Sequence, residues 1–171
     1  MKLPVLFAYL TESHQRRHGP SGYLNYSDFK PWLRDEFVFR CVYCLEREQW
    51  YPDRFASFSV DHVIPQSKNK NLVNVYENLV YACTRCNSAR QDVTLLDPTK
   101  QALGNHLKLG EEGMLEGLTE EGLRLIERLQ LNENPALKNR PSASDLSTSP
   151  NPSIAFVDWH KRHTHTTEEL A

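Results

Sequence analysis

The chain has 171 residues, of which 39% are apolar, and a formal net charge of −2. This length fits one compact domain with extensions, and the modest apolar fraction predicts a small core surrounded by polar segments. A net charge this close to zero excludes attraction of a polyanion by the molecule as a whole. Binding of nucleic acid would therefore require a local basic surface.

The N-terminal segment has too short an apolar run for a secretory signal and lacks a small-residue cleavage site. No apolar stretch approaches the roughly 20 residues that a membrane-spanning helix needs. We therefore expect a cytoplasmic protein with no membrane partner. In that compartment the four cysteines would stay reduced and available for a metal ion.

Residues 1–38 are predicted to form an N-terminal helical region. The segment from Pro4 to His18 is compatible with a short helix that the following Gly-Pro-Ser-Gly turn would end. A second helix is expected from Ser27 to Phe37, because apolar residues recur there at helical spacing after a serine that can cap the first turn.

Residues 39–97 are predicted to form the core. Polar and apolar residues alternate over 57–60, which indicates a strand, and Pro65 ends it. A second short strand is expected over 79–82, and a helix from 84 or 85 to about 93. The predicted order of strand, loop, strand and helix indicates an α+β fold.

Residues 98–140 are predicted to be a helical extension and residues 141–171 a Ser/Pro-rich linker with a C-terminal tail. In the extension, Thr119 is the expected N-cap of a helix on which Leu123, Ile126 and Leu129 recur at helical spacing. The tail carries three histidines, which we interpret as part of a solvated terminus and not as a metal site.

Four cysteines form two Cys-x-x-Cys pairs, Cys41/Cys44 and Cys83/Cys86. A gap of two residues lets both sulfurs of a pair reach one ion, so the spacing predicts a zinc site that is closed by four thiolates and is therefore structural. A redox dithiol would need only one pair, and buried free cysteines do not come as matched pairs. The long interval between the pairs predicts a folded insertion between them.

The insertion contains Asp61-His62, and Asn78 and Asn87 flank the second cysteine pair. The pattern C-x-x-C, D-H-x-x-P, E-N-L-V-x-x-C-x-x-C-N over residues 39–90 resembles the HNH endonuclease family. The resemblance implies a small ββα-metal (His-Me finger) core stapled by a four-cysteine zinc site, with flanking helices. It also implies metal-dependent hydrolysis of phosphodiester bonds in nucleic acid, with DNA as the expected substrate. Residues 106–140 resemble, more weakly, the extension that follows the core in some bacterial members.

The resemblance also assigns roles to residues. His62 would be the general base that takes a proton from the attacking water, a task that suits a neutral imidazole. Asp61 and Asn87 would hold one catalytic Mg2+ or Mn2+, because hard ions prefer oxygen ligands. Asn78 would orient the loop that carries the histidine. Arg90, where the family often has lysine, would hold phosphate or stabilise developing negative charge.

The expected nucleic-acid surface consists of Lys68, Lys70, Arg85 and Arg90. Adjacent residues of a regular strand point to opposite faces, so Asp61 and His62 can serve one phosphate only if the strand ends or bends there.

The rival interpretation is a zinc-stabilised nucleic-acid-binding or protein-interaction module that cuts nothing. Such a module needs the cysteines but has no use for the Asp, His and Asn together. A zinc-dependent hydrolase of another phosphoester is a third alternative. The sequence leaves the oligomeric state open.

Overall fold

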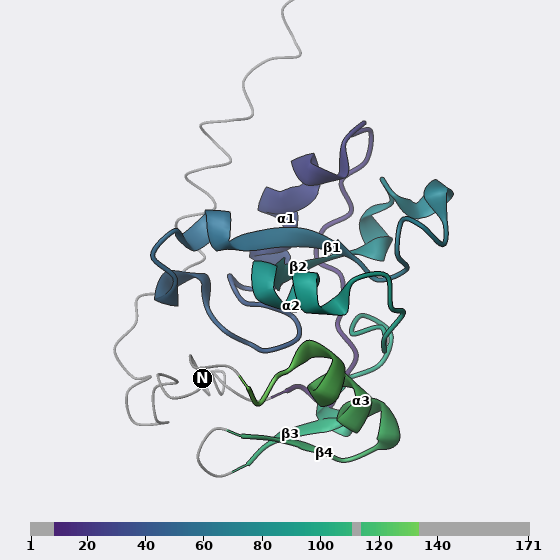
Figure 1. Ribbon diagram of the computed structural model, residues 1–171. Helices are drawn as coiled ribbons and strands as arrows, with labels where there is room; N and C mark the ends of the chain where they lie inside the picture. Colours follow the sequence, from purple (N-terminus) through teal and green to yellow (C-terminus); the bar gives the residue numbers. More distant parts are fainter. Residues whose placement is uncertain (1–8, 111–113, 134–171) are drawn as a thin grey trace, which may run out of the picture.

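The computed structural model describes residues 9–110 and 114–133 (Figure 1). Its helices and strands follow one another in this order: η1 (Tyr26–Phe29), α1 (Lys30–Glu36), η2 (Glu48–Trp50), η3 (Arg54–Ser57), β1 (Phe58–His62), η4 (Lys70–Leu72), η5 (Tyr76–Asn78), β2 (Leu79–Cys83), α2 (Thr84–Arg90), η6 (Leu103–Asn105), β3 (Leu107–Leu109), β4 (Leu115–Gly117) and α3 (Glu120–Leu129), where η denotes a 3-10 helix.

An antiparallel pair of strands, β1 and β2, forms the centre of the fold. The register pairs Phe58 with Cys83 at one end and His62 with Leu79 at the other. All five residues of β2 are buried, and α2 follows that strand without an intervening loop. The predicted order of strand, strand and helix is confirmed, and with it the α+β class.

The two faces of this hairpin are covered by different helices (Figure 1). Ser59 and Asp61 point towards α2, where they contact Asn87 and Arg90. The other face carries Tyr81, whose hydroxyl donates a hydrogen bond to the Glu48 carboxylate at 2.9 Å. Glu48 also accepts two hydrogen bonds from Arg34 of α1, so α1 lies on the Tyr81 side. The alternation of side chains along β1 therefore separates an α1 face from an α2 face.

The strands β3 and β4 pair antiparallel, and β4 packs against α3. Thr119 is the N-cap of α3, because its side chain accepts a hydrogen bond from the Gly122 amide, as predicted. The predicted packing stripe needs a correction. Leu125 and Leu129 are buried, whereas Leu123 is 57% exposed, because the helix rests on the small hairpin that the sequence analysis did not predict.

The predicted N-terminal helix is absent from its described part, residues 9–18, which has no helical turn. The segment instead contacts distant elements. Its Leu10 carbonyl accepts a hydrogen bond from the Gly104 amide, and its Arg16 side chain donates one to the Leu79 carbonyl at 2.7 Å. Long-range contacts therefore replace the local hydrogen bonds that a helix would have made.

The predicted linker and tail over residues 141–171, and the end of the predicted extension, lie outside the described residues. The division into four segments stays a prediction. Within the described ranges, 9–110 and 114–133, no helix has both the length and the apolar character needed to cross a membrane.

Candidate metal centre and active site

The four cysteines meet in one buried cluster. Their Sγ atoms all lie within 4.8 Å of one another, and the Sγ atoms of Cys44 and Cys83 are 3.8 Å apart. A tetrahedral zinc site with Zn–S bonds of about 2.3 Å has sulfur–sulfur edges of roughly 3.8 Å. The donor set and its spacing therefore fit a zinc ion, and among the described residues this is the one group of three or more His, Cys, Asp or Glu side chains close enough to share an ion.

Backbone amides stabilise both cysteine pairs, the first in a tight turn and the second at the junction of β2 and α2. In the first, the Leu45 amide donates to the Cys41 carbonyl at 3.0 Å, and the Cys41 amide donates to the Glu46 carbonyl at 2.9 Å. Leu45 has a φ of +59°, a conformation that costs a non-glycine residue about 1 kcal/mol or more. In the second, the Cys83 sulfur accepts a hydrogen bond from the Cys86 amide and so caps α2.

The Asp61 carboxylate is buried between two donors. Arg90 of α2 forms an ion pair with its Oδ1, and the Tyr43 hydroxyl donates to its Oδ2 at 2.9 Å. Burial raises the pKa of Asp61 above its ordinary value, while the Arg90 charge and the Tyr43 hydrogen bond act in the opposite direction. Burial likewise raises the pKa of Tyr43, so the phenol keeps its proton and acts as a donor.

Asn87 lies one helical turn before Arg90 and faces the same strand. Its amide nitrogen donates to the Ser59 hydroxyl at 2.9 Å, and Ser59 is two residues before Asp61 on the same face of β1. The side chains of Asn87 and Asp61 thus lie in one interface between α2 and β1. One carboxylate and one amide oxygen suit Mg2+ or Mn2+ as a donor set.

The imidazole of His62 lies on the other face of β1. It packs edge-on against the Tyr26 ring, with centroids 4.7 Å apart, and its Nε2 is 3.0 Å from the Val73 carbonyl oxygen. Its Nδ1 is 3.3 Å from the amide nitrogen of Gln66. Because β1 stays regular up to His62, the bend that would bring His62 beside Asp61 is absent, and the two side chains emerge on opposite faces at the end of the strand.

Asn78 connects the two ends of the loop between β1 and β2. Its Oδ1 accepts a hydrogen bond from the Ile64 amide at 2.9 Å, and its Nδ2 donates to the carbonyls of Ile64 and Leu72. Because Ile64 is two residues beyond His62, these contacts hold the segment that carries the histidine. They are the contacts that the predicted orienting role requires, and the role itself stays a prediction.

The predicted basic surface divides into exposed and buried members. Lys68 and Lys70 are exposed on the loop after β1, and Lys68 donates to the Thr94 hydroxyl at 3.1 Å. Arg85 is half-buried and donates to the Gln130 carbonyl at 3.2 Å. Arg90 is 1% exposed, so in this structure its partner is the Asp61 carboxylate and not a phosphate at the surface.

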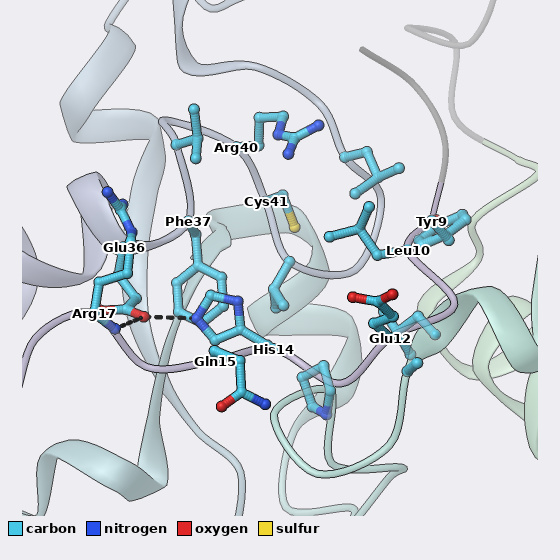
Figure 2. A pocket seen from close by; sticks show the side chains of 16 residues that line it. Tyr9, Leu10, Glu12, His14, Gln15, Arg17, Glu36, Phe37, Arg40 and Cys41 are labelled. Atoms are coloured by element: carbon cyan, nitrogen blue, oxygen red, sulfur yellow. Dashed lines mark hydrogen bonds and ion pairs between the residues drawn. The ribbon is translucent and has the colours of Figure 1, made fainter. Parts of the chain in front are cut away.

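A cavity of about 330 Å³ lies beside the first cysteine pair, between the N-terminal segment and the end of α1. Figure 2 shows His14 and Arg17 joined to the Glu36 carboxylate at this cavity, with Arg40 and Cys41 beyond them. Neither Asp61, His62, Asn78 nor Asn87 lines the cavity. It is therefore separate from the residues to which the sequence assigns chemistry.

Sequence reasoning missed three residues that contact the candidate site: Tyr43, Tyr26 and Gln66. Tyr43 stands between the first two cysteines, where its residue type carries no signal that it reaches Asp61. Gln66 directly follows Pro65 of the D-H-x-x-P motif, which places it on the loop with His62. Tyr26 is distant in the sequence and no pattern could have associated it with the histidine.

Sequence comparison relates the segment that contains the four-cysteine cluster and the ββα unit to a known family. Residues 41–92 match the sequence model of the HNH endonuclease family, so this part of the chain is an HNH endonuclease domain, and the family implies cleavage of nucleic acid. The chain is also similar to the Septu protein PtuB of Bacillus thuringiensis, with 29% identity over 102 residues. That alignment covers 55% of this chain and 37% of the relative. No solved structure gives a significant match.

Proposed function

We propose that this protein is a metal-dependent endonuclease that hydrolyses phosphodiester bonds in DNA. The observation that carries the proposal is the ββα unit, in which β1 and α2 bring the Asp61 carboxylate and the Asn87 amide into one interface. The second cysteine pair lies at the junction of β2 and α2 within this unit, which is part of the segment that matches the HNH family. The family supports cleavage of nucleic acid, and the choice of DNA is part of the proposal.

His62 acts as the general base through Nδ1. The Val73 carbonyl oxygen can only accept a hydrogen bond, so the Nε2 atom next to it must carry the proton. The lone pair of the neutral ring then lies on Nδ1, where the Gln66 amide is now placed and an attacking water would bind. Burial lowers the pKa of His62, an effect that the Val73 contact opposes, and a lowered pKa keeps the ring neutral at physiological pH.

Asp61 and Asn87 would hold the catalytic Mg2+ or Mn2+. A divalent ion at such a site polarises the scissile phosphate and stabilises the leaving oxygen. Arg90 contributes by holding Asp61, and Asn78 by holding the loop of His62. Because Asp61 and His62 emerge on opposite faces, the phosphate would bind across the end of β1, where the two faces meet.

The four cysteines would hold a structural zinc, since a sphere closed by four thiolates leaves no position for water. Lys68 and Lys70 are exposed on the loop that follows His62 and would contact the phosphates that flank the scissile bond. A cytoplasmic location is part of the proposal, because reduced thiols are what zinc binding requires.

One observation favours the rival function of a nucleic-acid-binding module without catalysis. The Asp61 carboxylate already has a buried cationic partner in Arg90, which reduces the negative charge available to a divalent ion. The two functions differ in what happens to DNA: the module would retain it uncut, whereas the nuclease would nick it in the presence of Mg2+ or Mn2+.

The first prediction concerns His62→Ala. We expect this variant to lose plasmid nicking by at least about 100-fold, because a general base contributes roughly that factor or more, while one zinc per chain is retained. Because His62 is 5% exposed, a small loss of thermal stability is also expected. Nicking is measured on supercoiled plasmid with Mg2+, with Mn2+ and with chelator.

His106→Ala is the matched control, because His106 is a partly buried histidine whose ring binds the Thr119 hydroxyl at 2.8 Å in a different part of the molecule. It should nick like the wild type. Wild-type activity in the His62 variant would contradict the base assignment. Binding of DNA by the wild type without any metal-dependent nicking would favour the non-catalytic module.

A further inference from the structure

Tyr43 connects the cysteine cluster to the candidate catalytic carboxylate. It lies between Cys41 and Cys44, and its side chain is 2% exposed. Its hydroxyl donates to Oδ2 of Asp61 at 2.9 Å. Its backbone carbonyl accepts a hydrogen bond from the buried Tyr9 hydroxyl. Hydrogen bonds therefore fix Tyr43 both at its backbone carbonyl and at its side-chain hydroxyl, whose acceptor is Asp61.

The backbone around Tyr43 leaves its ring little freedom. The preceding residue, Val42, donates its amide to the Tyr81 carbonyl of β2 at 3.0 Å, and the turn of the first cysteine pair is closed by the Leu45 amide. Two sulfurs of that turn belong to the four-cysteine cluster. The position of the Tyr43 hydroxyl is thus set by the cluster on both sides and by the edge of β2.

The other oxygen of Asp61 is held by Arg90. Arg90 ends α2, the helix that begins with Thr84 immediately after Cys83 and includes Cys86. One donor to the carboxylate therefore comes from the turn of the first cysteine pair, and the other from the helix of the second. Each cysteine pair is therefore linked to Asp61 through one side chain, Tyr43 for the first pair and Arg90 for the second.

We propose that Tyr43 is a positioning residue, which holds the Asp61 carboxylate in the orientation that binds the catalytic divalent ion and so links the four-cysteine site to that ion. The inference rests on the proposed function. A carboxylate oxygen that accepts one hydrogen bond keeps a further lone pair for an ion. Groups that hold a metal ligand in this way typically change metal affinity by about 10- to 100-fold when they are removed.

The test is Tyr43→Phe, which removes the hydroxyl and keeps the ring. Binding of Mn2+ to the zinc-loaded protein is measured by titration calorimetry in the absence of DNA, and zinc content is measured before and after. We expect one zinc per chain in both proteins and a Kd for Mn2+ that is raised about tenfold in the variant. In plasmid nicking, the Mg2+ concentration for half-maximal rate should rise by a similar factor, with the rate at saturating Mg2+ changed by less than about threefold.

Tyr81→Phe is the matched control. Tyr81 is also fully buried, and its hydroxyl also donates to a carboxylate, that of Glu48, at the same 2.9 Å. Each variant therefore loses one buried hydrogen bond to an acid, and both should lose similar thermal stability. A role of Tyr43 in folding alone would give equal Mn2+ affinities in the two variants, and that result would overturn the inference.

Two further outcomes are separable. If the wild type binds no Mn2+ beyond its zinc and cuts nothing, the proposed function and this inference both fail. If the wild type binds Mn2+ and cuts, and Tyr43→Phe binds Mn2+ unchanged, the inference alone fails.

Should Tyr43→Phe not retain zinc, Tyr9→Phe replaces it, because loss of the Tyr9 hydroxyl loosens the Tyr43 backbone and should weaken Mn2+ binding in the same direction. Unchanged Mn2+ binding in that variant would likewise overturn the inference.

Discussion

At the scale of single residues, the Glu36 carboxylate anchors the N-terminal segment. It is 2% exposed and is 2.6 Å from His14 Nε2, and it accepts hydrogen bonds from the amides of Arg17 and His18 at 2.9 and 3.0 Å. Burial raises its pKa, but these hydrogen bonds outweigh burial and lower the pKa to about 2. The ionised carboxylate therefore stabilises the folded state.

The sign of this contribution gives a prediction for stability against pH. A carboxyl group whose pKa is lower in the folded state stabilises the folded protein at pH values above its unfolded pKa of about 4.5. This stabilisation is lost as the pH falls towards 2. Glu36→Gln should therefore lower the free energy of unfolding at pH 7, and the difference from wild type should shrink between pH 4.5 and pH 2. Urea unfolding across this range measures it.

Glu77→Gln, at an exposed glutamate, is the control and should change stability little at any pH in the series. A difference between wild type and Glu36→Gln that stays constant down to pH 2 would contradict the electrostatic account and indicate a purely steric effect.

At the scale of elements, α3 approaches the chain before β3 so closely that a side chain does not fit. A Cβ atom on Gly122 would lie 1.9 Å from the His106 carbonyl oxygen, which also accepts a hydrogen bond from the Leu118 amide at 2.8 Å. Helix propensity favours alanine over glycine by about 1 kcal/mol. The clash with the His106 backbone oxygen opposes this preference for alanine. A backbone atom cannot move aside as the end of a flexible side chain can.

Gly122→Ala should therefore destabilise the protein, by roughly 1 to 3 kcal/mol, as overpacked substitutions do. The measurement is urea unfolding at neutral pH. Leu123→Ala in the same helix is the control, because Leu123 is 57% exposed and should change stability by less than about 0.5 kcal/mol. A stabilised Gly122→Ala protein would show that propensity decides at this position and that α3 is not held against His106.

At the scale of the whole molecule, the cysteine cluster joins segments that are 39 residues apart at their nearest cysteines, Cys44 and Cys83. The turn of the first pair, strand β2 and helix α2 all converge on it. Structural zinc contributes about 10 to 16 kcal/mol in small zinc-binding peptides, which is comparable to the total stability of a domain, about 5 to 15 kcal/mol. Zinc-free protein should therefore lose most of its cooperative fold.

Removal of zinc with a strong chelator should abolish the cooperative thermal transition followed by circular dichroism, and added Zn2+ should restore it. Cys41→Ser should behave like the chelated protein, since three thiolates hold the ion less tightly. The control is the wild type dialysed into buffer that contains neither Mg2+ nor chelator, which should keep its transition. A zinc-free protein that melts at the wild-type temperature would contradict a structural role for the ion.

Local features of this protein were predictable because they depend on near neighbours in the chain. The two-residue gap between paired cysteines indicates a shared ion, alternation around Val60 indicates a strand, and Thr119 before two glutamates indicates a helix start. These predictions were confirmed as a cysteine cluster, β1 and the capped helix α3. The HNH assignment was likewise carried by motifs that lie within one segment.

Contacts between distant residues were not predictable in this way, because neither spacing nor residue type encodes them. Nothing in the sequence shows that Tyr43 reaches Asp61, that Arg90 is buried against the same carboxylate, or that residues 9–18 extend over α1 in place of a helix. Gln91 illustrates the same limit. Its φ of +52° is one that glycine adopts without strain, and a long-range hydrogen bond from Arg128 to its side chain at 2.9 Å accompanies that conformation.

The chain's own order of residues was enough to predict the cysteine cluster and the ββα order, since both depend on local spacing and periodicity. The residues proposed for chemistry were identified through the resemblance of their motifs to the HNH family. The tertiary structure decided which helix covers each face of β1. It also decided which side chains hold the proposed residues in place, because both depend on how the helices pack on the hairpin. Packing is a property of the folded whole, because burial and hydrogen bonding are satisfied by groups that the chain brings together from distant positions.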